Sequence, residues 1–394
     1  MTLPRYRRRD PLDALRYLLQ TGVRPATSLE EARAAAYVDS RLRRAGLSVS
    51  ADTFRAPDTP GLTFALLVLP GLCAALLGVF AGPLPAFWLA LYGLMLTFTD
   101  ALAMPLPLVA RTRDSQNIVA ARARVGEYQT ATPPPPRWRL VLLTPLDTPR
   151  QQHGLAMLQG RNAPAQVGRM LAYALLFGLL VLLQMMPTLV WQVALLVPLA
   201  YLIFAALPPG THIDDAALFG SSGALAVALA AVEQLRTLER VEVWMVALGS
   251  TSTSERGLLD LLRRYPFPHS STLLVALPHL GDGELVQITH EGLLRQHTAD
   301  PLLRELVDEV STNLSRDEVL REVMRPLPKR PAASSAGLAS VLYRRGYRTI
   351  TLRTINDPPP TIPEDEAMVN LHFRMLDPTT RLITEMVQRL EQYT

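Results

Sequence analysis

The sequence is poor in cysteine, and two long stretches have no charged residue. Its 394 residues contain one cysteine, Cys73. This excludes a disulfide framework and any metal site built on cysteine ligands, and it is consistent with a reducing compartment. Asp, Glu, Lys and Arg are absent from residues 61–99 and again from residues 170–213. Each stretch is about twice the roughly 20 residues that one helical membrane span needs.

Proline and glycine interrupt each uncharged stretch near its middle, as "AGPLPA" in the first and "MMPT" in the second. We therefore predict two transmembrane helical hairpins, at residues 61–104 and 166–209, with four spans in all. Helices buried in a soluble core are the alternative, but uncharged runs of this length are rare there. Neither uncharged stretch is expected to be a cleaved signal peptide, because the basic segment "MTLPRYRRRD" is followed by an ordinary charged segment and not by an apolar core with a cleavage site.

Two hairpins return the chain to the side on which it started, so residues 1–60, 105–165 and 210–394 are expected to share one compartment and one polar domain. Arginine greatly outnumbers lysine and is dense at the hairpin ends that face this domain, whereas the hairpin tips carry no charge. Positive charge in short flanking loops marks the cytoplasmic side. We predict a multi-pass protein of the inner or plasma membrane with a cytoplasmic polar domain.

The net charge of +4 suits the anionic surface of the cytoplasmic leaflet. The lipid bilayer is therefore the expected partner. The positive balance follows from membrane topology, and no nucleic acid is expected.

Strands and helices alternate along the polar part. The segment from Ser28 to Gly46 has an N-cap serine, acidic residues in its first turn and a glycine stop, which predicts a helix. A glycine turn at Gly220 and Gly223 is expected before an apolar helix that runs from about Ser222. Apolar strands between helices predict an α/β class fold, a three-layer α/β/α domain with a mixed, mostly parallel sheet. In such sheets ligands bind beyond the carboxyl ends of the strands.

The order of the motifs resembles a known family. The helix and strand "EEARAAAYVDSRLRRAGLSV", the strand "SQNIVA", the strand "WRLVLLTPLD", the segment "DDAALFGSSGALAVALAAVEQL", "SERGLLDLL" and "TIPEDEAMVN" follow one another as in the di-zinc aminopeptidases of metallopeptidase family twenty-eight, relatives of glutamate carboxypeptidase and the transferrin receptor ectodomain. The resemblance covers most of the polar chain from about residue 28. It implies a zinc-exopeptidase-like domain, into which the two hairpins are inserted.

The resemblance also implies positions for the zinc ligands, and most of them hold other residue types. The histidine of the family's His-x-Asp motif falls on Pro145, a later aspartate falls on Pro278, and the last histidine falls on Thr361. Three family-like carboxylates are retained, namely Asp147, Asp215 (or Asp214 if the turn slips) and Glu255.

The general base of the family is missing in either alignment of the segment from Gly249 to Glu255. Its position falls on Ser254 if "SERGLL" is matched, or on Thr251 if the match follows Gly249 directly. A pair of zinc ions needs imidazole or carboxylate ligands from several segments. The expectation is therefore no metal cofactor, no catalytic residue and no peptidase activity.

A rearranged site is the alternative, with His212, Asp215 and His279 as ligands and zinc as cofactor. The serine-rich segment "GSTSTSE" lacks a nucleophile elbow and is interpreted as polar turn chemistry. Three functions stay open. They are a membrane-anchored pseudo-peptidase that binds a peptide or protein partner or acts as a scaffold, a membrane-tethered metallo-aminopeptidase or hydrolase with a shifted site, and a structural membrane component.

Overall fold

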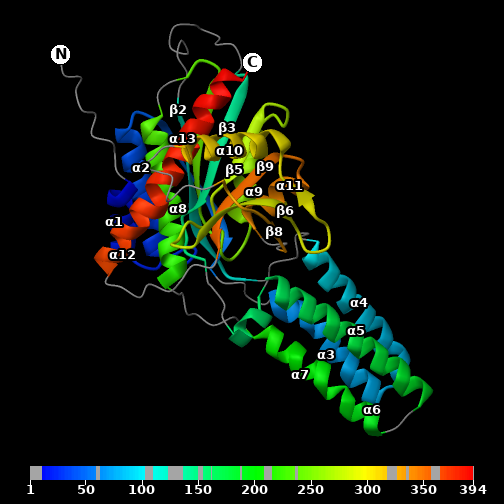
Figure 1. Ribbon diagram of the computed structural model, residues 1–394. Coiled ribbons are helices and arrows are strands. Elements are labelled where there is room, and N and C mark those ends of the chain that lie inside the picture. Colours follow the sequence, from blue (N-terminus) through cyan, green and yellow to red (C-terminus); the bar gives the residue numbers. More distant parts are fainter. Residues whose placement is uncertain are drawn as a thin grey trace, which may run out of the picture.

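A computed structural model of the protein describes residues 11–58, 63–102, 110–122, 136–149, 154–160, 162–186, 189–207, 215–235, 238–316, 326–333, 337–355 and 364–393. These residues form an α/β domain and a bundle of apolar helices that projects from one end of it (Figure 1).

The sheet of the α/β domain has nine strands, in the order β1-β2-β4-β3-β5-β9-β6-β7, with β8 paired to β6. Neighbours run parallel across β4-β3-β5-β9, and antiparallel pairs flank this centre. The strands are β1 Ser48–Pro57, β2 Thr112–Arg122, β3 Trp138–Pro145, β4 Val241–Leu248, β5 Thr272–Ala276, β6 Glu284–Glu291, β7 His297–Thr298, β8 Lys329–Ala332 and β9 Arg348–Ile355.

Helices cover both faces of the sheet. Alternate residues of β3 point to opposite faces, as strand geometry requires, so Leu140 and Leu142 join one core and Val141 and Leu143 join the other. The first core is packed by α1 Pro11–Thr21, α2 Leu29–Arg44, α8 Asp215–Gln234, α10 Pro301–Leu314, α12 Glu364–Leu371 and α13 Asp377–Gln392, and the second by α9 Arg256–Arg264 and α11 Leu338–Arg344. The predicted three-layer fold is confirmed.

The predicted helix boundaries hold well at α2, where the Ser28 hydroxyl accepts a hydrogen bond from the Glu31 N–H at 3.1 Å. The predicted turn at Gly220 and Gly223 is wrong, because both glycines lie inside α8. Their missing side chains serve packing instead: a Cβ atom on Gly223 would lie 2.2 Å from the Leu280 carbonyl oxygen. The helix thereby approaches the loop after β5 backbone to backbone.

The bundle consists of α3 Thr63–Phe80, α4 Pro83–Ala101, α5 Ala163–Met185, α6 Leu189–Ala194 and α7 Leu196–Ala206, with the short 3₁₀ helix Gly154–Leu158 before α5. Tyr173 of α5 lies at its centre and is fully buried. Pro70 inside α3 has no N–H to donate. Next to it, the Tyr173 hydroxyl is inserted between a backbone carbonyl and a backbone N–H of this helix. This hydroxyl donates to the Leu67 carbonyl at 2.6 Å and accepts the Gly71 N–H at 3.1 Å.

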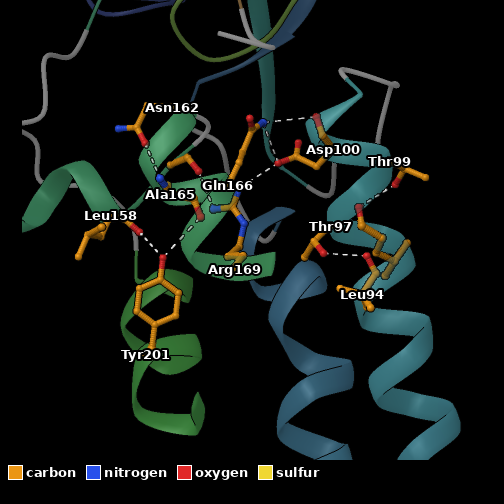
Figure 2. A network of polar contacts seen from close by, with 12 residues as sticks. Leu94, Thr97, Thr99, Asp100, Leu158, Asn162, Ala165, Gln166, Arg169 and Tyr201 are labelled. Atoms are coloured by element: carbon orange, nitrogen blue, oxygen red, sulfur yellow. Dashed lines mark hydrogen bonds and ion pairs between the residues drawn. The ribbon is translucent and has the colours of Figure 1, made fainter. Parts of the chain in front are cut away.

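A fully buried ion pair joins the two hairpins where they meet the α/β domain. Arg169 of α5 lies 2.9 Å from the Asp100 carboxylate at the end of α4 (Figure 2). It also donates to the Gly160 carbonyl at 2.7 Å. Gln166 adds an amide contact to the same Asp100 carboxylate at 3.4 Å. Because neither charge reaches solvent, each needs the other, and the pair fixes how α4 and α5 align.

Within the described part of the chain, four helices are long and apolar enough to cross a membrane, namely α4, α5, the combined segment Leu189–Ala206 and α8. Helix α8 differs from the other three because 83% of its apolar stretch is buried inside the α/β domain. It is therefore a core helix. The apolar stretch of α3, Phe64–Phe80, is shorter. The bundle thus contains three helices of spanning length and the slightly shorter α3.

Candidate functional site

The sheet has a topological switch point at the carboxyl end of β3. The next two parallel strands, β4 and β5, lie on opposite sides of β3. The chain connections therefore diverge at this end of β3, which is the position where α/β sheets usually bind ligands. Asp147 follows β3 by two residues and is fully buried at this position. Asp147, where the family resemblance implies an aspartate, therefore lies at this edge of the sheet.

The Asp147 carboxylate is hydrogen-bonded to the turn that follows β4. One oxygen accepts the Thr251 N–H at 2.9 Å and the Thr251 hydroxyl at 2.6 Å. The other oxygen accepts the Ser252 N–H at 2.7 Å. Three donors from one turn thus use both oxygens.

Glu31, from the first turn of α2, reaches the same turn. Its carboxylate accepts the Ser250 N–H at 2.8 Å, the Ser115 hydroxyl at 3.0 Å and the Thr27 N–H. Thr27 and Ser250 both have positive φ, 62° and 54°, which is unusual for residues other than glycine. The pKa of Glu31 is raised to about 7, first by burial and then by the nearby Asp147 charge, while these three hydrogen bonds oppose the shift.

Arg24 supplies the positive charge. Its guanidinium is fully buried and donates to the Leu146 and Leu18 carbonyls at 2.8 and 3.1 Å, and to the Ser222 and Ser221 hydroxyls at 3.1 and 3.2 Å. Burial lowers the pKa of Arg24 to about 10, while the charges of Asp147 and Glu31 act in the opposite direction. Arg24 therefore stays protonated at neutral pH. We call Arg24, Glu31, Asp147 and the turn residues 250–252 the switch-point cluster.

The remaining predicted positions do not join this cluster in a way that would build a metal site. Pro145 pairs with Leu248 in the sheet and offers no donor atom. Glu255 lies at the start of α9 and forms an ion pair with Arg344 of α11, at 3.2 Å. Pro278 follows β5 and is half-buried. The predicted base positions are occupied by turn contacts: Thr251 donates to Asp147, and the Ser254 N–H donates to the Ser250 carbonyl at 3.3 Å.

The alternative ligand set is only partly within the described residues. Asp215 is exposed at the first position of α8. His279 is buried, and its ring lies against Gly220 of the same helix, where an added Cβ would be 1.9 Å from the ring. His212, Asp214 and Thr361 lie outside the described residues.

Among the described residues, no three or more His, Cys, Asp or Glu side chains are grouped so that they could hold a metal ion. The donor set that the structure describes at the switch point does not fit a pair of zinc ions. Pro145, at an expected ligand position, has no donor atom, and Asp147 already uses both of its oxygens as hydrogen-bond acceptors.

Sequence reasoning missed Arg24 and Glu31 as site residues. Glu31 was expected only as an acidic residue in the first turn of a helix, and Arg24 carries no motif. Their roles depend on α1 and α2 packing beside α8, and no spacing along the chain encodes that contact.

The comparisons with known proteins agree with this geometry at the level of fold. No protein-family model matches the chain, and no curated protein matches it in sequence. Among solved structures, a glutaminyl cyclase from Porphyromonas gingivalis is similar, with a TM-score of 0.50 and 10% identity over 98% of each chain. A Zn-dependent exopeptidase from Parabacteroides distasonis gives 0.49 and 10% over 100% of each chain. An aminopeptidase from Aneurinibacillus sp. strain AM-1 gives 0.49 and 11%, over 98% of this chain and 94% of the other.

The chain therefore has a glutaminyl-cyclase-like fold, at an identity that carries information about fold alone.

Proposed function

We propose that this protein is a membrane-anchored, peptidase-like protein that does not hydrolyse peptides and that acts as a binding or scaffolding module. The observation that carries the proposal is the set of hydrogen bonds that the Asp147 carboxylate accepts. In a working metal site this carboxylate would orient a ligand histidine. Here the histidine position is Pro145, and the carboxylate instead holds the turn after β4 through three hydrogen bonds.

The surface of the bundle supports the membrane anchor. Large apolar side chains point outward on all of its long helices, for example Phe80 at 83%, Trp88 at 63% and Met185 at 73% exposed. A water-soluble bundle would leave such a surface unfavourably hydrated, whereas lipid tails would cover it. The two hairpins at 61–104 and 166–209 would then be inserted into one domain made of residues 1–60, 105–165 and 210–394.

The flanking charges support a cytoplasmic position for the α/β domain. Arg111 and Arg113 follow the first hairpin and Arg161 precedes the second, while the turn at Ala81 and Gly82 between α3 and α4 carries no charge. Cysteine-scanning accessibility tests this orientation. The test uses a variant that lacks Cys73. With Gly82→Cys, an impermeant thiol reagent added to intact cells should label the protein. With Arg113→Cys, the same reagent should label the protein only after permeabilisation. The reverse pattern would overturn the orientation.

The proposed partners are the lipid bilayer and a peptide or protein that the α/β domain binds; we propose no nucleic-acid partner. The retained sheet and helices would give such a partner a rigid surface, since the switch-point cluster ties α1, α2 and the loops after β3 and β4 together.

The absence of peptidase activity is tested with the purified full-length protein, supplied with zinc and assayed with leucine and alanine anilides. A peptide with N-terminal glutamine belongs in the set, because one structural neighbour is a glutaminyl cyclase. We expect no turnover above that of a heat-denatured sample and no stoichiometric zinc in metal analysis. Turnover that a chelator abolishes, together with zinc that is lost in Asp215→Ala, would overturn the proposal and favour the rearranged site.

A further inference from the structure

A small cavity lies between the bundle and the α/β domain, away from the switch point. The end of α4 forms one wall through Ala101 and Leu102. The connection between β6 and β7 and the end of α11 form the others. Its volume is about 270 Å³, part of it open to solvent. That figure includes open solvent, so the enclosed space is much smaller, and it suits a small polar group that stays partly in contact with solvent.

The lining of the cavity gathers positive charge. Arg295 comes from the β6–β7 connection, His297 from β7 and Arg344 from α11. The pKa of His297 is lowered, first by burial and then by the charges of Arg295 and Arg344, so both guanidinium groups act on the same ring. Arg295 is exposed and forms no ion pair within the described part of the chain.

The guanidinium group of Arg344 is only partly hydrogen-bonded within the described part of the chain. One of its terminal nitrogens lies 3.2 Å from the Glu255 carboxylate, but its Nε is buried and has no hydrogen-bond acceptor among the described residues. A buried donor without an acceptor costs free energy, and Arg344 is one of the residues that line the cavity. Guanidinium groups match the geometry of phosphate oxygens well.

Glu291 is the one acid of the lining and is 5% exposed. Burial raises its pKa to about 7, while the Thr351 hydroxyl, at 3.4 Å, and the charge of Arg353 oppose the shift. At neutral pH the side chain is therefore protonated in a large share of molecules. In that form it adds no negative charge to the cavity.

We propose that this cavity binds a phosphate-type oxyanion, and that the natural source is the headgroup of an anionic phospholipid. Arg295 and Arg344 would contact the phosphate oxygens. The cavity adjoins the end of an apolar helix of spanning length, and Leu294 next to Arg295 is exposed at 44%, as expected for a segment at a bilayer surface. The choice of source depends on the membrane placement proposed above, but the anion site does not depend on the loss of peptidase activity.

The test uses the purified full-length protein in neutral detergent and titration calorimetry. The probes are short-chain phosphatidic acid, short-chain phosphatidylcholine and inorganic phosphate. The variant is Arg295→Gln. The matched control is Arg345→Gln, which removes the same charge from an exposed residue that follows α11 and does not line the cavity. Thermal unfolding of both variants checks that they remain folded.

We expect saturable binding of phosphatidic acid and no binding of phosphatidylcholine. Arg295→Gln should weaken phosphatidic acid binding about tenfold, the typical effect of losing one charge-assisted hydrogen bond, and Arg345→Gln less than about twofold. Equal binding of inorganic phosphate would support the anion site and assign it to a soluble ligand. Equal losses in both variants, or no saturable binding of either anion, would overturn the proposal. Extraction of the protein from membranes tests the anchor separately.

Discussion

The carboxylates of Glu31 and Asp147 divide three successive backbone N–H groups between them. The Ser250 N–H donates to Glu31 at 2.8 Å, and those of Thr251 and Ser252 donate to Asp147 at 2.9 and 2.7 Å. Successive N–H groups pointing one way form an anion-binding concavity. In this chain two of its own carboxylates fill that concavity, at the edge of the sheet where a ligand would otherwise bind.

Replacing Asp147 with asparagine should destabilise the α/β domain by about 1–3 kcal/mol. The amide has one acceptor oxygen, and its NH₂ group would face a backbone donor from the turn. The variant also removes a negative charge near Arg24. Unfolding followed by the fluorescence of Trp138 and Trp244, which lie in β3 and β4, measures the change.

The matched control is Asp13→Asn, which changes an exposed carboxylate in the first turn of α1. It should alter the free energy of unfolding by less than about 0.5 kcal/mol. An Asp147→Asn protein that unfolds like this control would show that the turn does not depend on the carboxylate.

Arg24 and Glu31 should be energetically coupled. Arg24→Met leaves two buried carboxylates without their counter-charge and should cost about 3–5 kcal/mol. Glu31→Gln should then cost less in the Arg24→Met background than in the wild-type protein, with a coupling energy of at least about 1 kcal/mol in a double-mutant cycle. Additive effects of the two substitutions would contradict the assignment of Arg24 as their common counter-charge.

Much of the fold could be predicted because its signals are local. The helix after Ser28 has a capping serine, and the strand Trp138–Pro145 is a continuous apolar run. The prediction of a turn at Gly220 and Gly223 was wrong because glycine is required in two different situations, at a positive φ and where two backbone segments approach closely. The second situation applies in α8, and it can be recognised only from the position of the loop after β5.

The sequence could predict which ligand positions of the family hold other residue types, but it could not predict how the residues of the site contact one another. Pro145 could be recognised as unable to bind a metal from its residue type alone. That Asp147 would instead hold residues 250–252 could not, because the partners are more than 100 residues apart along the chain. Arg24 and Glu31 remained hidden for the same reason, since a buried charge is identified by its partners and not by its neighbours in sequence.

Gly93 of α4 should tolerate no side chain, although glycine is generally unfavourable in helices. A Cβ atom there would lie 2.3 to 2.5 Å from the ring and hydroxyl of Tyr173. Gly93→Ala should therefore destabilise the bundle by about 1–3 kcal/mol through overpacking. At Gly178 of α5 an added Cβ meets nothing within 4 Å, so Gly178→Ala should be neutral or slightly stabilising. Thermal unfolding in detergent compares the two variants, and equal melting temperatures would refute the tight packing at Tyr173.

Glu291 should make the protein less stable as the pH rises from about 5 to 8. Its pKa in the folded protein is about 7, above the ordinary value of 4.5, so between these values the folded state binds the proton more tightly than the unfolded state. Stability from this group is fully present below pH 4.5 and is lost as the pH passes 7. The change is on the order of 3 kcal/mol, since one pKa unit corresponds to about 1.36 kcal/mol.

The variant Glu291→Gln has no titrating proton and should flatten this dependence. Glu31, whose pKa is also raised to about 7, should contribute a residual slope of the same sign. Unfolding measured at pH 5 and pH 8 gives the two slopes, and Glu366→Gln, a change at an exposed position of α12, provides the control. If Glu291→Gln retained the full wild-type slope, the carboxyl group would have to be ionised and solvated in the folded protein, and the cavity beside α4 would carry a permanent negative charge that opposes an anion.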